Sequence, residues 1–177
     1  MSPAPDVLER ARHITTLVLD VDGVLTDGRI IYDEWGDELK CFDVQDGAGL
    51  MLWRRAGLRS AIITARHGRV IKRRAKELRV DFLAQRALEK LPAYEKLLRR
   101  WRFAPEHACA IGDDLMELPL LRRVGLAVAM PNAVDEVKAV SHYVTQRPGG
   151  RGAVREVIDL VLKASGRWEG LLKRYQV

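Results

Sequence analysis

Short apolar runs alternate with longer amphipathic segments along most of the chain. The runs are aliphatic and β-branched, as in Thr15–Leu19, which is typical of a strand buried on both faces of a parallel sheet. The segments between them carry apolar residues at helical spacing. This alternation predicts right-handed βαβ crossovers, and so an α/β, Rossmann-like and mostly parallel sheet with helices on both faces. The expected strands are 15–19, 58–63, 80–84, 107–111, 126–130 and 142–145, and the expected helices are about 6–11, 45–56, 69–79, 91–101, 116–124, 133–140 and 153–164.

One segment breaks the alternation. Residues 29–33 and 38–43 read as two strands that flank the turn Glu34-Trp35-Gly36-Asp37, which predicts a β-hairpin over about 29–43. The remaining intervals along the chain are filled by single helices and strands, so they leave no room for a cap domain. We therefore expect one domain over 1–177, with a tail of uncertain order from about 166.

Composition narrows the class of protein. The 177 residues are 47% hydrophobic and 31% charged, which is ordinary for a soluble globular protein. No apolar run reaches membrane-spanning length, and Met1–Asp6 lacks the pattern of a secretory signal, so we expect a cytoplasmic protein with no membrane partner. Cys41 and Cys109 are far apart and outside any Cys/His cluster, so neither a disulfide framework nor a zinc site is indicated.

The net charge of +6 permits nucleic acid, an anionic surface or a phosphorylated small molecule as partner. The basic residues concentrate in 66–79, where they alternate with apolar residues at helical spacing, as on a solvated helix face. This stretch has no interleaved aromatic residues and no recognisable binding motif, so we expect no nucleic-acid partner.

Polar residues follow several of the predicted strands. Asp20 and Asp22 end the first, Thr64 ends the strand after the hairpin, Lys90 begins a later helix, and Gly112-Asp113-Asp114 follows Ile111. Each has a structural reading of its own: a strand cap, a backbone-bonded hydroxyl, a solvent lysine, a turn. Parallel sheets bring such strand ends to one rim, and three acids with a hydroxyl and an ammonium there suit Mg²⁺-dependent phosphoryl transfer.

These residues resemble the motifs of haloacid dehalogenase superfamily phosphatases. Asp20-Val21-Asp22-Gly23-Val24-Leu25-Thr26 matches the first motif, and the later motifs follow in the expected order. By that resemblance Asp20 is the nucleophile that forms an aspartyl phosphate, and Asp22 is the general acid and base and offers its backbone carbonyl to Mg²⁺. The other implied roles are phosphoryl binding by Thr64 and Lys90, and metal binding by Asp20 and Asp113 together with Asp22, with Asp114 in support.

The hairpin, the absence of a cap and the late segment Gly149–Glu156 make the chain similar to 3-deoxy-D-manno-octulosonate 8-phosphate phosphatases. That resemblance implies a phosphorylated acidic eight-carbon sugar as substrate, used in lipopolysaccharide precursor synthesis. It also implies a homotetramer whose hairpins associate and help to close adjacent active sites. The residues that match substrate-facing positions are Asp43, Gln45, Asp46, Gly47, Arg66, Arg74 and Arg151.

The chain departs from that pattern at two substrate-facing positions. Gln45 stands where a basic residue is usual, and Asp43 where Asn or His is common. Phosphatases of nine-carbon acidic sugars are therefore the alternative within the same class. The segment before Lys90 also differs, and Lys96 is its near competitor. A receiver-type signalling domain is an alternative from another class, but its phosphorylated Asp lies on a middle strand and it needs no hairpin.

Overall fold

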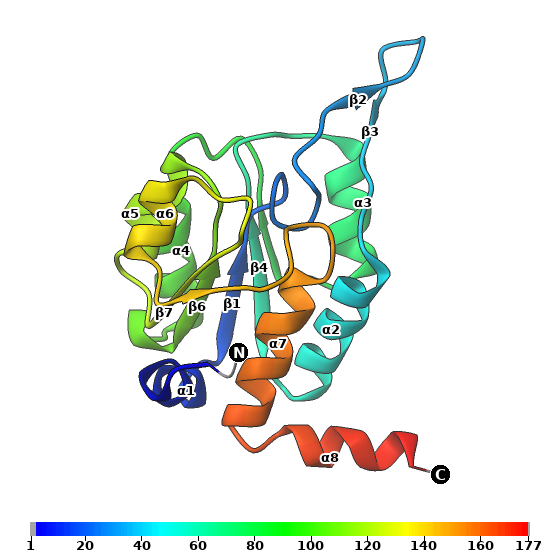
Figure 1. Ribbon diagram of the computed structural model, residues 1–177. Helices are drawn as coiled ribbons and strands as arrows, with labels where there is room; N and C mark the ends of the chain where they lie inside the picture. The colour runs from blue at the N-terminus through cyan, green and yellow to red at the C-terminus, as the bar shows by residue number, and fades with distance from the viewer. Residues whose placement is uncertain (1–2, 177) are drawn as a thin grey trace.

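A six-stranded parallel sheet in the order β5-β4-β1-β6-β7-β8 forms the centre of the computed structural model, which describes residues 3–176 (Figure 1). The α/β fold expected from the sequence is confirmed. The strands are β1 (Thr16–Leu19), β4 (Arg59–Ile63), β5 (Phe82–Ala84), β6 (Ala108–Ile111), β7 (Leu126–Ala129) and β8 (Tyr143–Val144).

The two faces of the sheet carry side chains of different size. Successive strand residues point to opposite faces, so Leu17 and Leu19 enter one core and Val18 enters the other. The second core is lined by strand alanines, such as Ala110 and Ala127, which leave room for helices to pack closely. The first face is covered by α1 (Pro5–Arg12), α2 (Val44–Arg55), α3 (Arg69–Glu77) and α7 (Ala153–Ala164), and the second by α4 (Lys90–Trp101), α5 (Leu118–Leu121) and α6 (Asp135–Val140) (Figure 1).

The strand order places the carboxyl ends of three strands side by side. At the end of β1, Leu19 pairs with Ile62 of β4 on one side and with Ile111 of β6 on the other. The chain builds β4 and β5 on one side of β1 and then crosses to β6 on the other side. Open α/β sheets bind ligands at such a switch point, outside the strands' carboxyl ends.

The predicted hairpin is present and projects from the body of the protein (Figure 1). Its strands β2 (Ile31–Tyr32) and β3 (Glu38–Leu39) are antiparallel and shorter than the sequence pattern indicates. They form a separate two-stranded sheet, so no third strand extends the pairing toward the body within residues 3–176. Within the same described range, the chain between β1 and β4 holds only this hairpin and α2, so it contains no cap domain.

The C-terminal tail is ordered up to residue 176, where the sequence left its order open. It forms α8 (Trp168–Leu172) and the 3₁₀ turn η3 (Lys173–Tyr175), and Val177 lies outside the described residues. Trp168 packs against the first core, and Arg55 donates a hydrogen bond to the Tyr175 hydroxyl at 2.6 Å. Two further 3₁₀ turns are η1 (Pro105–His107) and η2 (Leu115–Glu117), so the helix expected over 116–124 begins as a 3₁₀ turn.

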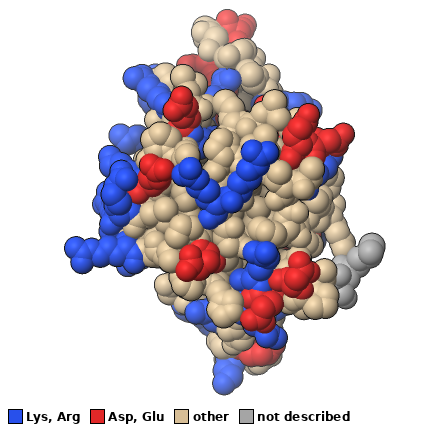
Figure 2. Space-filling view, turned by 90° about the vertical axis from the view of Figure 1, so that its left-hand side faces the viewer, with Lys and Arg blue, Asp and Glu red and all other residues tan. Residues whose placement is uncertain are grey.

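The surface over α4, α5 and α6 carries both signs of charge. Figure 2 shows Lys and Arg in small groups on this face with Asp and Glu among them. Some are paired, as in Arg123 with Glu95 at 3.0 Å and Lys138 with Asp135 at 3.5 Å. Across residues 3–176, no helix combines the length and apolar character needed to cross a bilayer.

Candidate active site

The loop after β1 is organised by a buried threonine. Thr26 accepts hydrogen bonds from the N–H groups of Gly23 and Gly28 at 3.4 and 3.3 Å, and its hydroxyl donates to the carbonyl of Val21 at 3.3 Å. Gly23 and Gly28 both have positive φ, which glycine adopts without steric cost. The loop therefore folds back on itself, and Asp20 and Asp22 lie at its start, at the carboxyl end of β1.

The carboxyl ends of β1, β4 and β6 enclose a cavity of about 220 Å³. Its lining brings together strand-end residues that lie far apart in the sequence, as the motifs predict. Those among the predicted site residues are Asp20, Asp22, Thr64, Arg66, Lys90, Asp113 and Asp114, with Gly28, Ala65 and Met116 completing the lining.

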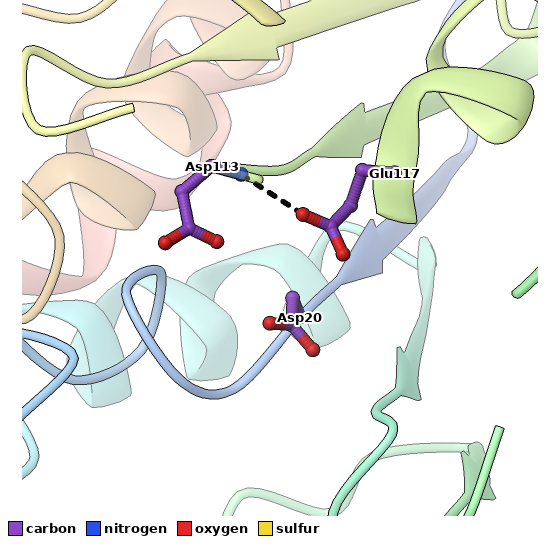
Figure 3. A group of neighbouring side chains, drawn as sticks. All are labelled: Asp20, Asp113 and Glu117. Carbon is purple, nitrogen blue, oxygen red and sulfur yellow. Dashed lines mark hydrogen bonds between the residues drawn. The ribbon is translucent and has the colours of Figure 1, made fainter. Parts of the chain in front are cut away.

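Three carboxylates lie close together, and two of them, Asp20 and Asp113, line this cavity (Figure 3). Oxygens of Asp20, Asp113 and Glu117 all lie within 4.8 Å of one another. Glu117 is not among the residues expected from the sequence; it is buried and accepts the N–H groups of Asp113 and Asp114 at 3.2 and 2.9 Å. Glu117 therefore fixes the loop that carries Asp113, and a capping-box pattern, an acid three residues before a Glu, is its only trace in the sequence.

Lys90 connects two of these acids. Its ammonium lies 2.7 Å from Asp20 and also pairs with Glu117, and its side chain is 2% exposed. Burial alone would lower the pKa of Lys90, but the carboxylates of Asp20 and Glu117 outweigh it and raise the pKa above its usual value. Lys96, the sequence competitor, is exposed on α4 and lies outside the cavity lining.

The two aspartates are harder to ionise than usual in spite of Lys90. Burial raises the pKa of Asp20 to about 6, with Lys90 opposing the shift and Glu117 adding to it. Burial also raises the pKa of Asp113 to about 7, aided by the charges of Glu117 and Asp20. Clustered carboxylates that resist ionisation are stabilised by a hard cation with oxygen ligands. Asp20 and Asp113 thus provide donors that fit Mg²⁺.

Asp114 and Asp22 have other partners in the structure. The Asp114 carboxylate accepts the N–H of Leu115 at 2.7 Å and caps η2, so its side chain supports the loop. The Asp22 carboxylate faces Lys40 and Arg66, and it is not part of the acid cluster. Its predicted metal contact is through the backbone carbonyl, and that assignment stays a prediction.

The glycine-rich segment 148–152 packs directly on the β1 loop. A Cβ at Gly149 would lie 1.7 Å from the carbonyl oxygen of Gly23, so only glycine allows this approach. Asn132 bridges the two loops, because its amide donates to the Gly23 carbonyl at 3.1 Å and accepts the Gly149 N–H at 2.9 Å. The segment therefore shapes the β1 loop, and Arg151 at its end is exposed near Asp27 rather than in the cavity.

The remaining predicted substrate residues form a separate group where α2 begins. Asp43 caps α2 by accepting the N–H of Gln45 at 2.6 Å, and a Cβ on Gly47 would lie 2.8 Å from the Arg74 guanidinium. Gln45 accepts a hydrogen bond from Arg147 at 2.6 Å, so a basic residue that was not expected from the sequence lies beside it. Buried Asp46 accepts the N–H of Arg155 at 2.8 Å and so anchors the start of α7. None of these residues lines the cavity of its own chain within 3–176.

Replacing Gly23 by alanine is expected to weaken metal binding. A Cβ there would lie 1.8 Å from Oδ2 of Asp113, so the carboxylate has to move. We expect Mg²⁺ affinity, measured by isothermal titration calorimetry, to fall roughly 10- to 100-fold, the scale for residues that orient metal ligands. Gly36→Ala is the matched control, because Gly36 on the hairpin has a similar φ of 84° and an added methyl group there would meet no atom within 4 Å. Equal affinity in the two variants contradicts this assignment of Asp113.

The chain matches known proteins over most of its length. Residues 70–158 match the haloacid dehalogenase-like hydrolase family. A 3-deoxy-D-manno-octulosonate 8-phosphate phosphatase from Yersinia pestis is 44% identical over 94% of this chain and 89% of its own length. The enzyme of the same name from Escherichia coli strain K12 is 43% identical over 92% of this chain and 86% of its own length.

Solved structures agree with these sequence relatives. The crystal structure of a 3-deoxy-D-manno-octulosonate 8-phosphate phosphatase from Moraxella catarrhalis, in complex with magnesium ion, phosphate ion and KDO, superposes with a TM-score of 0.94 at 40% identity, covering 97% of this chain and 98% of that one. The cobalt-bound enzyme from Haemophilus influenzae has a TM-score of 0.85 at 34% identity, covering 89% and 92%. The resemblance expected from the sequence motifs is confirmed at the level of the family.

Proposed function

Because this chain belongs to the haloacid dehalogenase-like hydrolases, we propose that it is a Mg²⁺-dependent phosphomonoesterase that hydrolyses 3-deoxy-D-manno-octulosonate 8-phosphate. The observation that carries the proposal is the convergence of Asp20, Asp113, Thr64 and Lys90 on one small cavity, in a chain whose relatives of that name match it almost end to end. The product would be the free eight-carbon sugar acid, a precursor in lipopolysaccharide synthesis, and we place the reaction in the cytoplasm.

The first half of the reaction transfers the phosphoryl group to the protein. A carboxylate oxygen of Asp20 attacks phosphorus, and the bond from phosphorus to the sugar oxygen breaks, with its electron pair remaining on that oxygen. Asp22 lines the same cavity and donates a proton to the departing oxygen. The free sugar acid leaves, and Asp20 carries the phosphoryl group as an acyl phosphate.

The second half returns the protein to its starting state. Asp22, now a carboxylate, removes a proton from water, and the water oxygen attacks phosphorus. The bond from phosphorus to the Asp20 oxygen breaks, which releases inorganic phosphate and regenerates the carboxylate. The same carboxyl group thus acts as acid and then as base, and its proton balance closes over one cycle.

Lys90 and Thr64 act on the phosphoryl oxygens. The Lys90 ammonium, 2.7 Å from Asp20, is positioned to neutralise charge that develops on the transferring group. Thr64 is buried at the end of β4, and its hydroxyl already accepts the N–H of Arg66 at 3.3 Å, so its proton is free to donate toward phosphate. Mg²⁺ held by Asp20 and Asp113 would offset the repulsion between the Asp20 carboxylate and the phosphate dianion.

A panel of phosphate esters tests the proposed substrate. We expect the Mg²⁺-loaded protein to release inorganic phosphate from 3-deoxy-D-manno-octulosonate 8-phosphate with a kcat/KM at least roughly tenfold above that for a nine-carbon acidic sugar 9-phosphate, because pocket contacts separate such homologues by about 1–3 kcal/mol. A preference for the nine-carbon ester supports the alternative phosphatase. If the protein turns over none of the esters, the enzymatic proposal itself is wrong.

We also propose that the protein works as a homotetramer assembled through the hairpin. Residues directly opposite in an antiparallel pair share a face, so Ile31 and Leu39 lie on one face of the hairpin and Tyr32 and Glu38 on the other. Ile31 and Leu39 are 38% and 51% exposed, which is unusual for a two-stranded projection in water. A second copy of the hairpin is the occupant that would bury them, and it would bring the Asp43–Gly47 and Arg74 group toward a neighbouring cavity.

Replacing Ile31 by aspartate is expected to dissociate this assembly. A carboxylate on the apolar face would be buried without a partner, so light scattering should give a smaller mass than the wild-type tetramer. Val70→Asp on α3 is the matched control, since Val70 is similarly exposed at 37% and lies outside the hairpin. Mixed oligomers of Asp20→Asn and Arg74→Met subunits should regain turnover if copies share sites. A tetramer that persists in Ile31→Asp contradicts the hairpin interface.

A further inference from the structure

The base of the hairpin reaches into the active site through a lysine that the motifs do not include. Lys40 follows β3 directly, and its side chain is 1% exposed although its neighbours on the hairpin are largely in solvent. Its ammonium pairs with the carboxylate of Asp22 and lies 3.1 Å from Glu38. Lysine side chains are almost never fully buried unless their charge is paired, so the burial of Lys40 indicates that its ion pairs have a specific role.

Strand geometry explains how Lys40 reaches the site. Glu38 and Lys40 both contact side chains of the body, Arg66 and Asp22 respectively, while Leu39 between them is exposed, as expected where extended backbone continues past the end of β3. Glu38 also accepts a hydrogen bond from Arg66 at 2.6 Å, and Arg66 stands 3.9 Å from the second oxygen of Asp22. Lys40 and Arg66 therefore flank the Asp22 carboxylate, and both also pair with the carboxylate of Glu38.

We propose that Lys40, held by Glu38, is a positioning residue that fixes the Asp22 carboxyl group for proton transfer to the leaving oxygen. This inference rests on the proposed function, because it assigns Lys40 a part in the step that Asp22 performs there. Asp22 sits on a loop and not on a strand, so its side chain needs such partners to keep one orientation. Proton transfer depends steeply on that orientation.

The arrangement distinguishes positioning from substrate binding. Lys40 makes both of its ion pairs within the chain and does not line the cavity, whereas Arg66 does line it. Lys40 therefore acts through Asp22, and its loss should affect only the esters whose leaving oxygen needs a proton. The alkoxide that departs from a sugar phosphate is a poor leaving group and needs a proton, while p-nitrophenyl phosphate releases p-nitrophenolate, a stable anion that departs without protonation.

The test compares these two esters in the first turnover, which gives the rate of leaving-group release, and in the steady state, which gives KM and kcat. We expect Lys40→Met to slow leaving-group release from the sugar phosphate by about 10- to 100-fold with KM unchanged, and from p-nitrophenyl phosphate by less than about threefold. Glu38→Gln should show the same selectivity to a smaller degree, and Lys40→Arg should restore most of the rate. Lys72→Met and Glu136→Gln are the matched controls, because both residues are exposed and lie outside the network and the hairpin.

A combination with Asp22→Asn completes the design. If Lys40 acts through Asp22, Lys40→Met should add no further loss of rate to Asp22→Asn. Equal slowing of both esters, a raised KM with unchanged kcat, or additive losses in the double variant each overturn the proposal. Wild-type turnover of the two esters tests the proposed function separately, so failure of one conclusion is not confused with failure of the other.

Discussion

Asp20→Asn is expected to reduce phosphate release by roughly 10⁴-fold or more, the scale observed when a covalent nucleophile is removed. The asparagine amide has nearly the shape of the carboxylate and cannot attack phosphorus. The loss should appear in kcat, because no acyl phosphate forms. Steady-state phosphate release measures it directly.

The same variant should remain folded. Burial raises the pKa of Asp20 to about 6, so the folded protein holds the ionised form of this residue at a disadvantage. A neutral amide removes that disadvantage, and Glu117 remains as a partner for Lys90. We therefore expect the free energy of unfolding, measured by urea denaturation, to be unchanged or higher. Asp135→Asn, which alters an exposed acid outside the cavity, is the matched control. An active Asp20→Asn protein contradicts the assignment.

Lys90→Met is expected to lose both activity and stability. Removing one partner of a buried ion pair leaves uncompensated charge, here on both Asp20 and Glu117, and such changes cost about 3–5 kcal/mol of unfolding free energy. Phosphate release should fall by roughly 10²-fold or more, because one oriented donor to the phosphoryl group is lost. Urea denaturation and steady-state kinetics measure the two effects.

Two further variants separate these effects. Lys96→Met makes the same chemical change on the exposed face of the same helix, and it should alter stability by less than about 0.5 kcal/mol. Adding Glu117→Gln to Lys90→Met removes one of the unpaired charges, so it should restore part of the stability without restoring activity. A Lys90→Met protein with wild-type rate and stability rules out this role for Lys90.

Much of the fold follows from local pattern. Apolar runs such as Thr16–Leu19 belong to strands that are buried on both faces. In α3 and α7 the apolar residues recur at helical spacing because only one face of each helix is buried. The strand order then brings the chemically distinctive strand ends together, which is why the acid, hydroxyl and ammonium motifs could be assigned to one cavity before the structure was known.

Other features depend on contacts that no local pattern encodes. Glu117 reads as part of a capping box, and only packing places its carboxylate against Lys90. In the sequence Lys40 is one of several polar residues of the hairpin. Its ion pair with Asp22 depends on the position at which the hairpin joins the body of the protein. The segment from Gly149 was part of the family resemblance in the sequence, but nothing local in it shows that Gly149 packs on the backbone of Gly23. The helix of the tail is held in place by Trp168, which packs against the first core.

The central claim is that Asp20 takes a phosphoryl group from an acidic sugar phosphate. The most direct measurement mixes the Mg²⁺-loaded protein with 3-deoxy-D-manno-octulosonate 8-phosphate, stops the reaction in acid within one turnover, and locates the modification by peptide mass spectrometry. We predict one phosphoryl group on Asp20, absent from Asp20→Asn. Phosphate release with an unmodified Asp20 peptide, or a phosphoryl group on another residue, would contradict the account.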